Sequence, residues 1–151
     1  MCREEGLQLS TAVKDNMLDG FEVFGVVKEV AVDDEGLEEF HRKYFNYPLY
    51  LDSEKEFYSA LGGRKMGMMS LMGLIPKSFG SLGKRLKAKE IEGNFKGEGL
   101  LQGGIILFNK FGESVYSYQE ITGEELPMED IIEAADKIRA QSKGSSESTE
   151  L

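Results

Sequence analysis

Short strand-like runs alternate with longer amphipathic segments along this chain, and that order constrains the fold more than any other feature. The β-branched and aromatic run FEVFGVVKEV at 21–30 predicts a strand, and PLYL at 48–51 predicts a second one. Helical patterns cover 3–18, 33–44 and 54–61, before, between and after these runs. Because two strands joined through a helix lie parallel in one sheet, we expect an α/β domain.

The second half of the chain adds an antiparallel pair and a last helix. The sequence GIILFNKFGESVYSYQ at 104–119 predicts a β-hairpin with a tight turn from Asn109 to Gly112. A short amphipathic helix is expected within 77–91, and Pro127 fits the first turn of a helix that continues to residue 140. A mixed sheet covered by helices follows.

Composition sets the class of protein. Hydrophobic residues at 40% and charged residues at 30% describe a globular chain, so we expect one domain over 1–140 and a disordered tail of Ser, Glu, Gly and Thr at 141–151. The net charge of −9 argues against a nucleic-acid partner, because phosphate contacts need a basic face. The apolar stretch at 66–76 is shorter than the roughly 20 residues that cross a bilayer. We expect neither a transmembrane segment nor a secretory signal.

Cysteine and histidine counts limit the chemistry. Cys2 is the one cysteine, which excludes an internal disulfide and favours a reducing compartment, so we expect a cytoplasmic protein. His41 has no second histidine beside it and is interpreted as a solvated or packed residue, so no metal site is expected. The glycines at 97, 99 and 103 lack the spacing and the preceding strand of a nucleotide-binding loop, so no cofactor is expected.

The first expected helix begins with Cys2, a geometry that thiol redox proteins use. A helix N-terminus carries partial positive charge, which stabilises a thiolate and lowers the pKa of the cysteine. Arg3 favours the thiolate, whereas Glu4 and Glu5 oppose it. The alternative is an inert thiol at a frayed terminus.

Four stretches of the chain resemble the peroxiredoxin-like 2 family, a branch of the thioredoxin-fold proteins related to alkyl hydroperoxide reductase and thiol-specific antioxidant enzymes (AhpC/TSA). They are CREE at 2–5, FGVVKE at 24–29, PLYLDSEKEFYSALGGRKM at 48–66 and GNFKGEGLLQGG at 93–104. The resemblance extends from Cys2 to about Arg139. It implies a thioredoxin-like mixed sheet with flanking helices and an antioxidant or thiol-disulfide redox role, with one branch of the family acting on prostaglandin endoperoxide-type lipids.

The chain departs from that family at its beginning. In the family a strand leads into Cys-x-x-Cys, and Cys2 matches the second cysteine of this motif. The first cysteine and the preceding strand have no counterpart, so we expect the sheet to lack its first central strand before the cysteine helix. We interpret MCREEG as the mark of a truncation, through an internal start, a splice variant or an incomplete gene model.

The resemblance also implies where a substrate would lie. LQGG at 101–104 takes the place of the loop that faces the cysteine in thioredoxin-like folds, although simple turn geometry explains its glycines equally well. The methionines of 66–72 would line an adaptable pocket for a lipid-like molecule, with core packing as the alternative. The predicted site residues are Cys2 and Arg3 as catalytic residues, and Gln102, Gly103, Met68 and Met69 as substrate-binding residues.

Two function classes follow. The first is a thiol-dependent enzyme that reduces peroxides, lipid endoperoxides or disulfides through Cys2 and is recycled by an external thiol such as thioredoxin or glutathione. The second is a non-enzymatic thioredoxin-fold binding module, inactive without the first cysteine, that holds a partner through residues 66–72 or through the exposed sheet edge.

Overall fold

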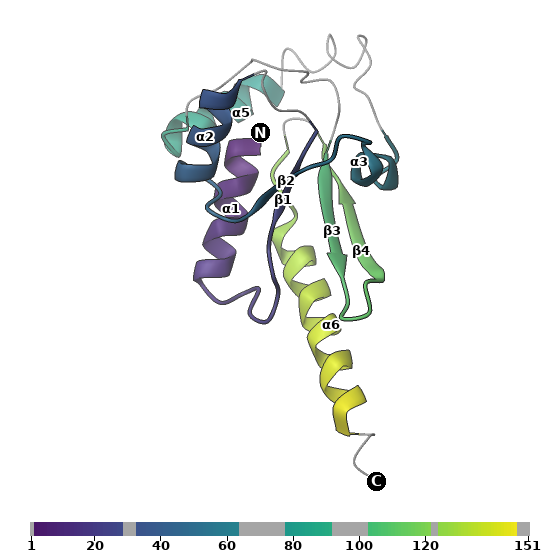
Figure 1. Cartoon of the computed structure of the whole chain (residues 1–151). Coiled ribbons are helices and arrows are strands. Elements are labelled where there is room, and N and C mark those ends of the chain that lie inside the picture. Colours follow the sequence, from purple (N-terminus) through teal and green to yellow (C-terminus); the bar gives the residue numbers. More distant parts are fainter. Residues whose placement is uncertain (1, 29–32, 64–77, 92–102, 122–123, 148–151) are drawn as a thin grey trace.

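The computed structural model describes residues 2–28, 33–63, 78–91, 103–121 and 124–147 (Figure 1). Helices and short strands alternate, which confirms the predicted α/β class. The elements are α1 (Cys2–Lys14), β1 (Gly25–Val27), α2 (Asp34–Lys43), β2 (Leu49–Leu51), α3 (Glu56–Ala60), α5 (Ser78–Ala88), β3 (Gly104–Phe108), β4 (Ser114–Gln119) and α6 (Met128–Glu147). The predicted helix within 77–91 is α5, whereas the predicted glycine loop at 93–102 lies outside the described residues.

The strands form two small sheets of opposite type. β1 pairs with β2 in parallel, with Gly25 opposite Leu49, as expected for strands joined through a helix. β3 and β4 form the predicted antiparallel hairpin, with Ile106 opposite Ser117. Among the described residues, the two pairs form separate sheets.

The end of α1 differs from the prediction, which extended this helix to residue 18. The helix ends at Lys14, and Asn16 adopts a left-handed backbone with φ 57°. The turn that follows buries Leu18, which is 6% exposed, and leaves Met17 43% exposed. Leu18 therefore joins the core from a turn and not from the predicted helix.

The predicted strand at 21–30 is also shorter than expected. Among its described residues, 21–28, the three residues Gly25–Val27 pair with a neighbouring strand, and all three are half-buried. Phe24 precedes the strand and is 45% exposed, with its ring edge against Tyr50 at 5.5 Å between centroids. A β-branched run predicts a strand, but its length depends on the neighbours available for pairing.

The polar caps of the short elements agree with the sequence. The Asp52 carboxylate accepts the backbone N–H groups of Glu56 and Phe57 at 2.8 and 3.0 Å, and so begins α3. In the hairpin turn, Asn109 Oδ1 accepts the N–H groups of Phe111 and Glu113 at 2.9 and 3.0 Å.

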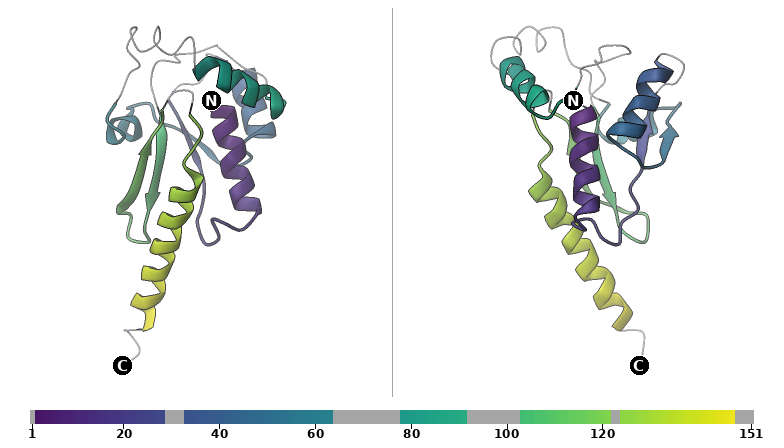
Figure 2. Two further views of the ribbon diagram at one scale, coloured as in Figure 1. Left: turned by 180° about the vertical axis from the view of Figure 1, so that it is seen from behind. Right: turned by 90° about the vertical axis from the view of Figure 1, so that its left-hand side faces the viewer.

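The apolar core lies between α1, α6 and the β3–β4 hairpin. Ile131 and Ala135 are 1% and 0% exposed on the face of α6 that contacts this core. The core residues are Ala12, Leu18, Leu107, Leu126, Ile131, Ala135 and Ile138. The C-terminal half of α6 projects away from the remaining elements in each view (Figures 1 and 2).

α6 continues beyond residue 140, where the prediction placed its end. It runs to Glu147 because Gln141, Ser142 and Lys143 tolerate a helical backbone. The division into a domain at 1–140 and a tail at 141–151 stays a prediction. Within the described ranges, no helix combines the length and the apolar character that crossing a membrane requires.

Candidate functional site at the first turn of α1

The first turn of α1 lies between α2 and α5 (Figure 2). Gly6 allows α1 to approach α2 closely, because a Cβ at this position would lie 2.9 Å from Cε2 of Phe40 and 3.2 Å from Cβ of Phe45. One turn further along, the Ser10 hydroxyl donates to the carbonyl of Tyr44 at 2.8 Å. These contacts fix the helix that begins with Cys2.

The Arg3 guanidinium is held by α2. It pairs with the Glu39 carboxylate at 2.7 Å and lies over the ring of Tyr44, 5.3 Å from its centroid. Lys43 pairs with the same carboxylate at 2.6 Å. The hydrogen bond from Lys43, with the charge of Arg3, keeps the pKa of Glu39 below its ordinary value. In the first turn of α1, the Arg3 side chain is therefore ion-paired with α2.

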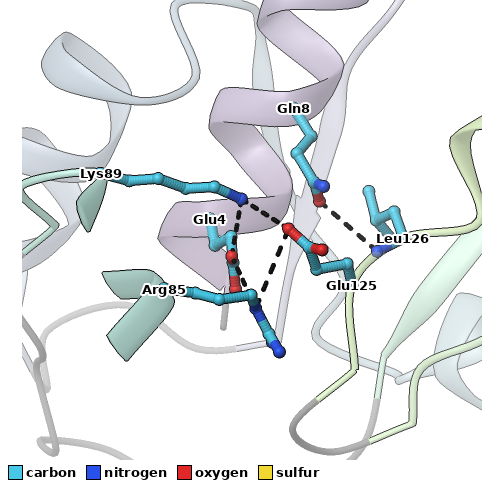
Figure 3. Close-up of polar contacts among 6 residues, drawn as sticks. All are labelled: Glu4, Gln8, Arg85, Lys89, Glu125 and Leu126. Atoms are coloured by element: carbon cyan, nitrogen blue, oxygen red, sulfur yellow. Dashed lines mark hydrogen bonds and ion pairs between the residues drawn. The ribbon is translucent and has the colours of Figure 1, made fainter. Parts of the chain in front are cut away.

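Glu4 faces the opposite side and is almost fully buried, with a side chain 2% exposed. Its Oε1 accepts hydrogen bonds from Lys89 Nζ at 2.8 Å and from Arg85 Nε at 3.3 Å (Figure 3). Burial disfavours the ionised form, but these hydrogen bonds outweigh it and hold the pKa of Glu4 below its ordinary value. Glu4 is therefore a buried carboxylate with cationic partners from α5 and its C-terminal turn.

Glu125, in the segment before α6, completes this cluster. Its Oε1 lies 2.6 Å from Lys89 Nζ and 3.8 Å from Arg85 Nε. Gln8, one turn after Glu4, accepts the backbone N–H of Leu126 at 3.4 Å (Figure 3). The polar contacts thus join α1, α5 and the start of α6.

Glu5 is directed toward the end of β4. Burial, followed by the charge of Glu120, raises the pKa of the Glu5 carboxyl to about 8. Glu120 is itself only 8% exposed, and its Oε2 accepts the backbone N–H of Gly103 at 3.1 Å. The raised pKa keeps Glu5 largely neutral near pH 7, so the first turn carries less negative charge than its sequence suggests.

The structure brings only some of the predicted site residues together. The backbone N–H of Gly103 donates to Glu120, and the charge of Glu120 acts on Glu5 in the first turn of α1. Cys2 is the first residue of α1, but its side chain is outside the described part of the chain, as are Met68, Met69 and Gln102. The roles assigned to these residues stay predictions.

Arg85, Lys89 and Glu120 are among the residues of this site that were not identified from the sequence. Arg85 and Lys89 belong to the basic run KRLKAK at 84–89, in which Lys84, Lys87 and Lys89 are exposed and Arg85 is half-buried. Arg85 and Lys89 both pair with Glu4. The helical spacing of Arg85 and Lys89 was the available signal, since positions four apart share a face. The sequence carries no signal for Glu120, because its burial depends on tertiary packing that a single stretch of sequence does not show.

Two other features carry no chemistry of their own. An apolar groove of about 330 Å³ lies beside α1 and α6, and its lining runs from Leu7 on α1 to Met17 in the turn after this helix, one turn or more beyond the cysteine. In the described ranges, no three His, Cys, Asp or Glu side chains are placed to hold a metal ion.

Comparison with known proteins establishes the family. Residues 8–121 match the family model described as AhpC/TSA antioxidant enzyme. The chain belongs to this family. The match begins after Cys2, so it does not itself include the cysteine.

The relatives agree with the resemblance stated from the sequence. Prostamide/prostaglandin F synthase of Salmo salar is 31% identical over 140 residues, which are 90% of this chain and 68% of that protein. The protein of the same name in Bos taurus is 34% identical over 66% of this chain and 51% of its own length. Peroxiredoxin-like 2A of Xenopus laevis is 32% identical over 93% of this chain and 60% of its own length. The chain thus spans about half to two thirds of these relatives, and no solved structure matches it significantly.

Proposed function

We propose that this protein is a thiol-based antioxidant or redox-regulatory protein of the peroxiredoxin-like 2 type, and that Cys2 is its reacting group. The observation that carries the proposal is the position of Cys2 at the first residue of α1 in a chain of the antioxidant enzyme family. The helix N-terminus favours a thiolate there. The names of the relatives, prostamide/prostaglandin F synthase, favour lipid endoperoxides beside simple peroxides as substrates.

The proposed reaction begins with attack of the Cys2 thiolate on a peroxide oxygen. The S–O bond forms as the O–O bond breaks, and the leaving oxygen takes a proton to become water or an alcohol. In a cyclic endoperoxide, both oxygens belong to the same substrate molecule. The sulfur therefore stays bonded to the substrate through the oxygen that it attacked. An external thiol then attacks the sulfur of Cys2 and displaces water, or the alcohol of the bound endoperoxide product, to form a mixed disulfide. A second external thiol attacks this mixed disulfide, releases Cys2 as a thiol and leaves together with the first one as the oxidised disulfide.

The resemblance supplies the remaining parts of this proposal. We propose a thioredoxin-like mixed sheet with flanking helices, and the parallel β1–β2 pair together with the antiparallel β3–β4 pair supports this arrangement. Thioredoxin or glutathione in the cytoplasm would supply the reducing thiols. Arg3 would act beside Cys2, while Gln102, Gly103, Met68 and Met69 would contact the substrate.

The test is peroxide consumption by the full chain in the presence of a thiol reductant. We expect turnover with hydrogen peroxide or a lipid endoperoxide, and none with Cys2→Ser, because the chain has one cysteine. Consumption that is equal in the two proteins would remove the enzymatic proposal.

A second candidate function is a binding module without thiol chemistry. Phe24, Tyr50 and Leu51 are 45%, 57% and 51% exposed at the β1–β2 pair, which favours an apolar, extended peptide added beside this pair. Tyr50→Ser should then weaken binding of such peptides in titrations, while Cys2→Ser should leave it unchanged. Equal binding by the wild-type protein and Tyr50→Ser would count against this candidate.

A further inference from the structure

A groove that is open to solvent runs between α1 and the start of α6, which lie side by side (Figure 2). Its volume is about 330 Å³. Most of its lining is apolar: Leu7, Ala12 and Met17 belong to α1 and the turn after it, and Met128 and Ile132 belong to α6. The groove lies one turn or more beyond the cysteine, so what it binds does not depend on the proposed thiol reaction.

The shape of the groove fits the side chains of a helix. Its lining follows α1 from Leu7 to Asp15, which is about 12 Å, or about two helical turns, at 1.5 Å per residue. A partner helix projects an apolar stripe over the same length. The volume holds roughly ten water-sized groups, which is roughly the number of carbon atoms in two or three leucine side chains. One apolar stripe of a helix would therefore fill the groove.

The apolar walls of the groove are only partly covered by the fold itself. Met17 is 43% exposed, and Leu7, Met128 and Ile132 are half-buried. Ala12, at 3% exposed, belongs to the core beneath them. Methionine side chains adapt to the shape of a partner, and this groove has one from the turn after α1 and one from α6. Covering these walls would remove further apolar surface from water, which favours association.

The charge around the groove favours a cationic partner. One charged residue of the lining, Lys89, is already paired with Glu4 at 2.8 Å and with Glu125 at 2.6 Å. The other, Asp15, is exposed and has no ion-pair partner among the described residues. In the first turn of α6, the exposed Glu129 also lacks an ion-pair partner within the described ranges. The groove is therefore apolar with uncompensated carboxylates beside it.

We infer that this α1–α6 groove binds an amphipathic helix of a partner protein, in which lysine or arginine flanks the apolar stripe. The stripe lies between Leu7 and Met17 on one side and Met128 and Ile132 on the other, and a flanking cation lies near Asp15. Apolar anchors at i, i+3, i+4 and i+7 are the usual way in which a helix occupies a hydrophobic groove. This surface is separate from the proposed thiol reaction and from the peptide-binding edge at the β1–β2 pair.

Two other occupants fit the charge less well. A second copy of this chain carries the same net charge of −9, which opposes self-association. A fatty acid gains little from Lys89, because two carboxylates already compensate that cation, and its own carboxylate is repelled by Asp15 and Glu129. A cationic helix gains from both the apolar walls and the unpaired acids.

The experiment titrates the full chain into fluorescein-labelled peptides and measures fluorescence anisotropy at low and at physiological ionic strength. The probe is a helical peptide of leucine and lysine, about four turns long, with leucine at i, i+3, i+4 and i+7. One control peptide has the same composition in scrambled order, so that it keeps the charge and loses the stripe. The other has glutamate in place of lysine, so that it keeps the stripe and reverses the charge.

The protein variants separate the apolar walls from the charge. Ile132→Gln and Met17→Gln change the walls, and Phe111→Gln is their control, because Phe111 is 73% exposed in the hairpin turn. Asp15→Asn changes the charge, and Glu35→Gln is its control, because Glu35 is an exposed acid on α2. Circular dichroism checks that each variant folds.

We expect the leucine–lysine peptide to bind and both control peptides to bind much more weakly. Ile132→Gln and Met17→Gln should each weaken binding by roughly fivefold or more. Asp15→Asn should weaken it by roughly two- to threefold at low salt and by less at physiological salt. Phe111→Gln and Glu35→Gln should leave the affinity unchanged.

Equal binding of the leucine–lysine peptide and its scrambled form would overturn the inference, and so would an unchanged affinity in the folded Ile132→Gln variant. If Ile132→Gln does not fold, Met17→Gln decides, because the Met17 side chain is exposed. Displacement of the peptide by decanoate, or a dimer that Ile132→Gln disrupts, would assign the groove to a fatty acid or to a second copy instead. The titration uses no peroxide, and Cys2→Ser should bind the peptide normally, so this inference and the proposed function fail separately.

Discussion

Gly6 determines how closely α1 packs against α2. Its missing Cβ would lie 2.9 Å from the Phe40 ring, so Gly6→Ala forces that ring or the helix to move. Overpacking costs about 1–3 kcal/mol and exceeds the helix-propensity gain of about 1 kcal/mol, so we expect net destabilisation of about 1 kcal/mol in urea unfolding. Gly83→Ala in α5 is the control, because its Cβ would meet nothing within 4 Å and should stabilise. Equal stabilisation by both substitutions would contradict this packing.

The raised pKa of the single residue Glu5 predicts that the stability of the folded protein depends on pH. Burial, with the charge of Glu120, raises its pKa to about 8 from its ordinary value of 4.5, so the folded state binds the extra proton between these two pH values. Its contribution to stability is complete below the unfolded pKa and is lost as pH rises through the folded pKa, by on the order of 1 kcal/mol per pH unit. Thermal melting should show Tm falling in this window, and less steeply in Glu5→Gln. Parallel Tm profiles would contradict the raised pKa.

At the scale of the element, a single carboxylate begins α3. Asp52 is 8% exposed and accepts two backbone N–H groups of this short helix, so Asp52→Ala should cost about 1–2 kcal/mol in chemical unfolding. Ser53, the next residue, is exposed, and Ser53→Ala should cost much less. Similar losses in both variants would show that the cap is not Asp52.

Helices and strands with a clear hydrophobic period were predictable from the sequence, but the residues at which they begin and end were not. The helical spacing and turn residues correctly predicted α2, α6 and the hairpin, because local preference and burial agree there. α1 ends early because Asn16 adopts a left-handed backbone, and β1 is short because pairing with β2 covers only Gly25–Val27. Both outcomes depend on neighbours that a single stretch of sequence does not contain.

At the scale of the whole molecule, the site combines residues that are distant in sequence. Arg85 and Glu4 are 81 positions apart, and Gly103 and Glu120 are 17 apart, so no local pattern reveals that they are paired. The cysteine at the start of a helix was predictable, because position in a helix is local information. The ion pairs of the first turn arise only when α2 and α5 pack against α1.

The most direct test of this account is the rate constant for oxidation of Cys2 by hydrogen peroxide near pH 7, compared with that of free cysteine. The account predicts a larger rate constant for the protein, by roughly tenfold if the helix N-terminus lowers the thiol pKa by about one unit or more. A rate constant equal to or below that of free cysteine, in the folded full chain, would contradict the claim that the first turn of α1 is a redox site.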